Sequence, residues 1–226
     1  MAGLIAATVR PGEKLTSGVQ HFAAGVVFAA AAIELLPQVL RQNPWVAIVG
    51  FAAGVLVMFG MRALTSWLEA RTHATAGRRL PLGFAGATAV DFAIDGVILG
   101  AGFTAGATTG LLLTIALAIE YLFVGLSLSA ALGPAASRRL VVAAPVGLSM
   151  LTLAGTVLGV WLLSGTSPTT LAAVLAFGAV AFMYLASEEL LVAAHERGET
   201  AAGSVTFFVG FLLYMVLSET LGPAPH

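Results

Sequence analysis

Seven long apolar segments constrain the fold of this chain more than any other feature of its sequence. Each is long enough to supply the ~20 residues that an α-helix needs to cross a bilayer. Their polarity does not alternate from residue to residue, as it would in the strands of a membrane barrel. Only 9% of the residues are charged, whereas soluble domains average about a quarter, so lipid must be the solvent. We therefore expect a single all-α transmembrane domain over residues 1–226, with helices at about 18–40, 45–68, 82–103, 108–132, 139–163, 168–194 and 203–221.

Positive charges are distributed unevenly between the two ends of these helices. Seven spans put the termini on opposite sides of the membrane, and nine of the ten Lys and Arg residues then fall on the N-terminal side, with only Arg41 on the other. Basic loops stay in the cytoplasm. We therefore expect a multi-pass protein of the inner or plasma membrane, with a cytoplasmic N-terminus and an extracellular or periplasmic C-terminus. No basic cluster suggests a nucleic-acid partner, and the lack of cysteine excludes disulfides and thiolate metal sites.

The first and sixth apolar segments resemble each other. The stretch FAAGVVFAAAAIELL, which starts at Phe22, aligns with FGAVAFMYLASEELL, which starts at Phe177, so that Glu34 matches Glu189. The VGF at 49–51 recurs at 209–211. Segments five apart in order cross the membrane in opposite directions. The pattern indicates an inverted-topology repeat, as in many secondary transporters whose substrate sites lie near the midplane.

Three acidic residues, Asp91, Asp95 and Glu120, lie near the middle of apolar segments. At mid-membrane each costs about 2.5–3.5 kcal/mol on insertion scales. The two aspartates, four residues apart, share one face of a helix, and Glu120 on the next helix can face them. Small residues allow these two helices to pack closely: Gly96 and Gly100 on the first, and Gly125, Ser127, Ser129 and Ala130 on the second. A single carboxyl group in a membrane helix could be protonated and hydrogen-bonded to the backbone. Three carboxyl groups at one depth, with no Lys or Arg at that depth, favour the binding of protons or of a metal cation.

Further ionisable residues lie toward the two membrane faces. Glu34 is near the outer end of the first segment, and Glu188 and Glu189 are near the inner end of the sixth. His21 and His195 lie near the inner ends of the same two segments. We expect Glu34 in an outer vestibule and the other four at a cytoplasmic mouth, as pathway or gate residues. For each histidine alone, an ordinary interfacial role stays open.

Several stretches resemble the ZIP (Zrt/Irt-like) family of metal transporters. FAAGVVFAAAAIELLPQVL resembles the family's second helix, FAAGxxLAxAFLHLLPEA, and DFAIDGVILGAGF its fourth, HNFxDGLAIGAAF. IALAIEYLFVGLSLSAAL resembles the fifth, IALHExPEGLALGAAL, while MYLASEELLVAAHE and VGFLLYMVLSETL resemble the seventh and eighth. The resemblance runs from about Phe22 to Leu221, without a counterpart of the first family helix. It implies a ZIP-like fold and a divalent-cation transporter that moves its metal-bearing helices against a scaffold.

The family's metal-ligand positions are altered in this chain. The family's His-Asn is replaced by Asp91-Phe92, and its His-Glu is replaced by Glu120-Tyr121. A later acidic or histidine position of the family is Val124 in this chain, and its Glu-Pro is Ala144-Pro145. The central ligands that remain are carboxylates. Zinc usually takes imidazole or thiolate ligands along with carboxylate, whereas oxygen ligands suit Mn²⁺, Fe²⁺, Mg²⁺ or Ca²⁺. We therefore expect one of these four ions, rather than zinc, as the substrate, and no second metal.

Other classes of membrane protein fit the sequence less well. A retinal protein needs a lysine inside a span, but the only lysine is Lys14. An intramembrane zinc hydrolase needs several core histidines. An intramembrane aspartyl protease needs two aspartates on facing helices, although Glu120 could partner one of those present. We expect a transporter and not an enzyme. A ZIP-like protein without transport, acting as a sensor or partner subunit, stays the alternative, and proton coupling, flux direction and a homodimer stay open.

Overall fold

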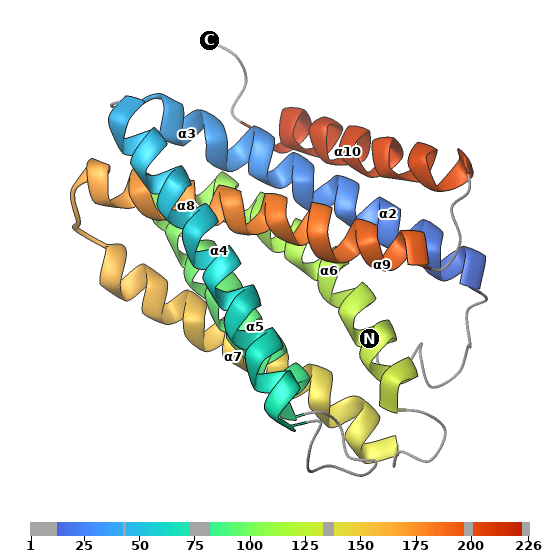
Figure 1. Cartoon of the computed structure of the whole chain (residues 1–226). Helices are drawn as coiled ribbons and strands as arrows, with labels where there is room; N and C mark the ends of the chain where they lie inside the picture. Colours follow the sequence, from blue (N-terminus) through green and yellow to red (C-terminus); the bar gives the residue numbers. More distant parts are fainter. Residues whose placement is uncertain (1–12, 43, 73–81, 133–137, 197–200, 223–226) are drawn as a thin grey trace.

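The computed structural model of the chain describes residues 13–42, 44–72, 82–132, 138–196 and 201–222. All regular structure in these residues is helical, and seven of the helices are long and apolar enough to cross a membrane (Figure 1). This confirms the expectation of an all-α, multi-pass membrane protein. The connection between the second and third expected helices, residues 69–81, lies mostly outside the described residues, and so does the connection between the fourth and fifth, residues 133–138.

The first and sixth membrane helices are interrupted by short π-helical segments, and the other five are continuous. The first consists of α2 (Glu13–Ala30), η1 (Ala31–Leu35) and α3 (Leu36–Leu40). The sixth consists of α8 (Pro168–Tyr184), η2 (Leu185–Leu190) and α9 (Leu191–Glu196). The continuous helices are α4 (Pro44–Thr72), α5 (Leu82–Ala105), α6 (Ala107–Leu132), α7 (Arg138–Leu163) and α10 (Ala201–Leu221). Helices α2 and α4 continue past the expected apolar boundaries into polar residues.

Two of the short connections have identifiable local causes. Before α8, Gly165 has a positive φ of 81°, and the Ser167 side chain accepts a hydrogen bond of 3.2 Å from the Thr170 amide. Ser167 is thus the N-cap, and Pro168 occupies the first helical turn, where its missing N–H costs nothing. Between α5 and α6 only Gly106 intervenes. These two helices therefore form a helical hairpin with a one-residue connection and pack against each other.

Three helix pairs dominate the packing: α2 with α10, α4 with α8, and α5 with α7. Figure 1 shows α10 lying along α2 at the edge of the bundle. The spans formed by α2 and α8 are the most buried, while α4, α7 and α10 expose many large apolar side chains, such as Trp45, Trp161 and Phe208. Exposed apolar surface of this extent indicates contact with lipid. The buried core therefore lies around α2 and α8.

The glycines Gly96 and Gly100 of α5 pack against α7, and not against α6 as the sequence had led us to expect. A Cβ atom on Gly96 would lie 2.3 Å from the Thr152 carbonyl oxygen, and one on Gly100 would lie 2.6 Å from that of Thr156. Gly155 and Gly159 of α7 approach α5 equally closely. Two Gly-x-x-x-Gly motifs thus face each other and let the two backbones touch. The side chains at 127, 129 and 130 lie outside the described set.

Candidate metal centre

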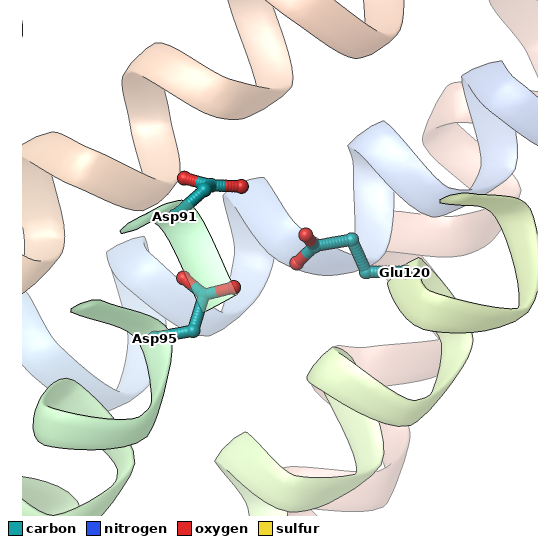
Figure 2. A group of neighbouring side chains, drawn as sticks. All are labelled: Asp91, Asp95 and Glu120. Atoms are coloured by element: carbon teal, nitrogen blue, oxygen red, sulfur yellow. The ribbon is translucent and has the colours of Figure 1, made fainter. Parts of the chain in front are cut away.

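The three central carboxyl groups come together in the structure. Asp91, Asp95 and Glu120 each offer an oxygen atom, and these oxygens all lie within 4.8 Å of one another. Figure 2 shows the two aspartates on successive turns of one helix, with the Glu120 side chain extending toward them from a neighbouring helix. Asp95 is 2% exposed and Glu120 0%, whereas Asp91 is partly exposed. The candidate site is thus closed at Asp95 and Glu120 and more open at Asp91.

The α5–α6 hairpin explains this convergence. Asp91 lies fifteen residues before Gly106, and Glu120 lies fourteen residues after it. In a tight antiparallel hairpin, residues equally far from the turn lie at the same height, because each helix rises 1.5 Å per residue. Asp95 is one helical turn from Asp91 and points from the same face. The site therefore follows from the position of the turn and the spacing of the acidic residues.

Glu120 is the least compensated member of the group. Neither carboxyl oxygen has a hydrogen-bond partner among the described residues, and both are buried. The one ion pair formed within the described residues, Arg62 with Glu188, lies elsewhere. A buried ionised carboxyl group without a partner is strongly unfavourable. Glu120 therefore requires a proton or a bound cation.

A network of two hydroxyl groups also holds Asp95. The Tyr121 hydroxyl donates to Asp95 Oδ2 over 3.2 Å and lies 2.8 Å from the Thr152 hydroxyl on α7. The Tyr121 ring stacks on Phe92, with ring centroids 4.1 Å apart and planes at 11°. Sequence reasoning treated Tyr121 and Phe92 only as replaced ligands and missed Thr152. Thr152 lies one turn before Gly155 on the stripe of α7 that faces α5, a spacing that could have indicated its position.

The two glutamates expected at the inner gate lie next to each other in η2. Glu188, in η2, forms an exposed ion pair of 2.8 Å with Arg62 of α4. Glu189, the next residue of η2, is exposed and does not belong to the group of three clustered carboxyl groups found among the described residues.

Glu34, the residue expected in the outer vestibule, is buried in η1 with 8% of its surface exposed. Its Oε1 atom accepts a hydrogen bond of 2.6 Å from the hydroxyl of Ser218 on α10. This carboxyl group is therefore tied to a neighbouring helix and lies outside the central cluster.

The two histidines expected at the inner mouth lie side by side. His21 is buried and His195 is exposed, with ring centroids 5.4 Å apart. The His21 Nδ1 atom donates to the Ser17 carbonyl over 2.9 Å, and the His195 Nδ1 atom donates to the Leu191 carbonyl over 2.6 Å. Neither histidine belongs to the group of three clustered ligands found among the described residues.

Comparison of the chain with models of known protein families finds no match, and comparison with curated proteins finds none either. The site must therefore be interpreted from its own chemistry. Three carboxyl groups supply up to six oxygens. Two oxygens on opposite sides of an ion are separated by about twice the bond length, which is ~4.1 Å for Mg²⁺ and ~4.6–5.2 Å for Ca²⁺. The three ligand oxygens, all within 4.8 Å of one another, are close enough for more than one of them to contact a single divalent cation.

Proposed function

We propose that the protein transports a divalent metal cation across the membrane, and that Asp91, Asp95 and Glu120 form its midplane site. The observation that carries the proposal is the fully buried Glu120 carboxyl group, without a partner among the described residues and beside two further carboxyl groups. Ionisable groups within membrane helices mark ion or proton pathways. An all-carboxylate site favours Mn²⁺, Fe²⁺, Mg²⁺ or Ca²⁺ over zinc.

The two π-helical segments support an inverted repeat. The alignment of Phe22 with Phe177 places Ala31–Leu35 on residues 186–190, which lie inside the second π segment, Leu185–Leu190. The packing follows the same repeat. If α2 corresponds to α8 and α4 to α10, the packed pair α2–α10 corresponds to the packed pair α8–α4. Inverted repeats and interrupted helices are characteristic of secondary transporters, and π segments often lie at functional sites.

Each π segment also carries a glutamate that is bonded to the helix packed beside it. Glu34 of η1 is bonded to Ser218 of α10, and Glu188 of η2 to Arg62 of α4. The two contacts are not at aligned positions, because Glu34 aligns with Glu189, but each joins a π segment to the helix packed beside it. We assign the first to an outer gate and the second to an inner gate, with the N-terminus in the cytoplasm. In alternating access the two gates would open one at a time.

Uptake of Mn²⁺ into liposomes containing the purified protein tests the proposal. The variants Asp91→Asn, Asp95→Asn and Glu120→Gln keep the side-chain shape and remove the charge. Each should reduce Mn²⁺ binding and uptake at least about tenfold, as the loss of one charged ligand predicts. Binding by the wild-type protein should also be weaker at pH about 6 than at about 8, because protons compete with metal for the same oxygens.

Glu219→Gln is the matched control, because Glu219 is an exposed carboxyl group on α10; its uptake should equal that of the wild type. Wild-type Mn²⁺ affinity in all three site variants would disprove the proposed cation site. Binding that depends on the three carboxyl groups, without uptake in any sample, would favour the alternative of a sensor or partner subunit.

A further inference from the structure

The hydroxyl of Tyr121 lies between two polar groups from different helices. It is hydrogen-bonded to Asp95 of α5 and to Thr152 of α7. Thr152 is buried, with 6% of its surface exposed. The stacking of the Tyr121 ring on Phe92 fixes the plane from which the hydroxyl projects. The position of the Asp95 carboxyl group is thus determined by three helices.

The direction of the hydrogen bonds follows from the number of protons available. An ionised Asp95 can only accept, so Tyr121 must donate its single hydroxyl proton to Oδ2. The Thr152 hydroxyl then donates to the Tyr121 oxygen, so the direction of both hydrogen bonds is fixed. Oδ2 is therefore already engaged on one side by the phenol.

We infer that Tyr121 determines which cation the site prefers, by restricting Asp95 to one coordinating oxygen. This inference rests on the proposed cation site. Ca²⁺ takes six to eight oxygen ligands and often uses both oxygens of a carboxylate, whereas Mg²⁺ requires a compact octahedron. Mn²⁺ also suits octahedral oxygen sites. A carboxylate held in one orientation disfavours the bidentate coordination that Ca²⁺ often uses, whereas a six-coordinate ion needs only one of its oxygens and takes water for the remaining positions.

The variant Tyr121→Phe tests this directly, because it keeps the ring and its stack on Phe92 and removes the hydroxyl. The affinities for Mn²⁺ and for Ca²⁺ are each measured by calorimetry on the purified protein. We expect the ratio of Mn²⁺ to Ca²⁺ affinity to fall about tenfold, the effect of one hydrogen bond to a charged group. Thr152→Val should lower the same ratio by a smaller factor, and Thr152→Ser should restore it.

Tyr214→Phe is the matched control. Tyr214 is fully buried on α10, and its hydroxyl has no hydrogen-bond partner among the described residues. Its loss should leave the ratio unchanged. A purely structural role of Tyr121 would lower both affinities together, and an unchanged ratio in both Tyr121→Phe and Thr152→Val would overturn the inference. Failure of the cation site itself is distinguishable, because Asp95→Asn and Glu120→Gln would then bind Mn²⁺ as the wild type does.

Discussion

The carboxyl group of Glu120 lies where neither solvent nor a donor from the described residues reaches it. A neutral amide of the same shape is cheaper to bury than a charge. We therefore predict that Glu120→Gln folds and melts, in the absence of metal, within a few degrees of the wild type. Its stabilisation by Mn²⁺ should be lost. A ligand at one hundred times its Kd stabilises the folded state by about 2.7 kcal/mol, which is readily seen in thermal melts with and without Mn²⁺.

The matched variant for this melt is Gln38→Glu. Gln38 donates a hydrogen bond of 2.9 Å to Thr109 and is only partly buried. This variant converts an amide into an acid, the reverse of Glu120→Gln, at a position outside the central cluster. Its stabilisation by Mn²⁺ should equal that of the wild type. A Mn²⁺ shift of wild-type size in Glu120→Gln would show that the Glu120 carboxyl group does not take part in binding.

At the same scale, the central carboxyl groups could be predicted from the sequence, but their surroundings could not. Asp91, Asp95 and Glu120 are conspicuous because each interrupts an apolar segment. Tyr121 and Thr152 are ordinary residues in membrane helices, and their role depends on which helix faces which. That arrangement is decided by packing across α5, α6 and α7; the spacing of Thr152 from Gly155 indicates a shared face of α7, but not which helix that face meets.

Among the elements, the α5–α7 contact supports the site, since it brings Thr152 to Tyr121 and Asp95. A Cβ atom on Gly100 would lie 2.6 Å from the Thr156 carbonyl oxygen and 2.8 Å from the Val160 amide nitrogen. These are backbone atoms, so the helices would have to move apart. We predict that Gly100→Ala lowers the free energy of unfolding by about 1–3 kcal/mol, as overpacking does, and weakens Mn²⁺ binding. Thermal melts in detergent and calorimetry measure the two effects.

Gly60 of α4 provides the comparison, because a Cβ atom there would meet nothing within 4 Å. Gly60→Ala should be neutral or stabilising by about 0.5–1 kcal/mol, since alanine is the better helix former. Equal melting temperatures for the two variants would contradict the close α5–α7 contact.

The α5–α7 pairing also shows where prediction of elements from this sequence ends. The apolar runs define the seven helices because lipid requires each to satisfy its own backbone hydrogen bonds. Small residues occur on α5, α6 and α7 alike, so Gly96 and Gly100 could have packed against either neighbour. The π segments could not be predicted, because the sequence around Glu34 and Glu189 reads as ordinary helix and the local i→i+5 bonding depends on the surrounding contacts.

For the whole molecule, the proposed transport cycle requires that the two gates move in opposite senses. Ser218 contacts Glu34, the residue of the proposed outer gate, and the exposed Ser187 precedes Glu188, the residue of the proposed inner gate. The chain has no cysteine, so Ser218→Cys and Ser187→Cys each introduce one conservative label site. We predict that Mn²⁺ changes the rates of labelling by a membrane-impermeant maleimide in opposite directions at these two sites, because alternating access opens one side as it closes the other. Ser164→Cys, in the exposed connection before α8, controls for reagent access and should label at a constant rate. Rates that change in parallel, or not at all, would rule out alternating access and favour a sensor that binds the cation without moving it.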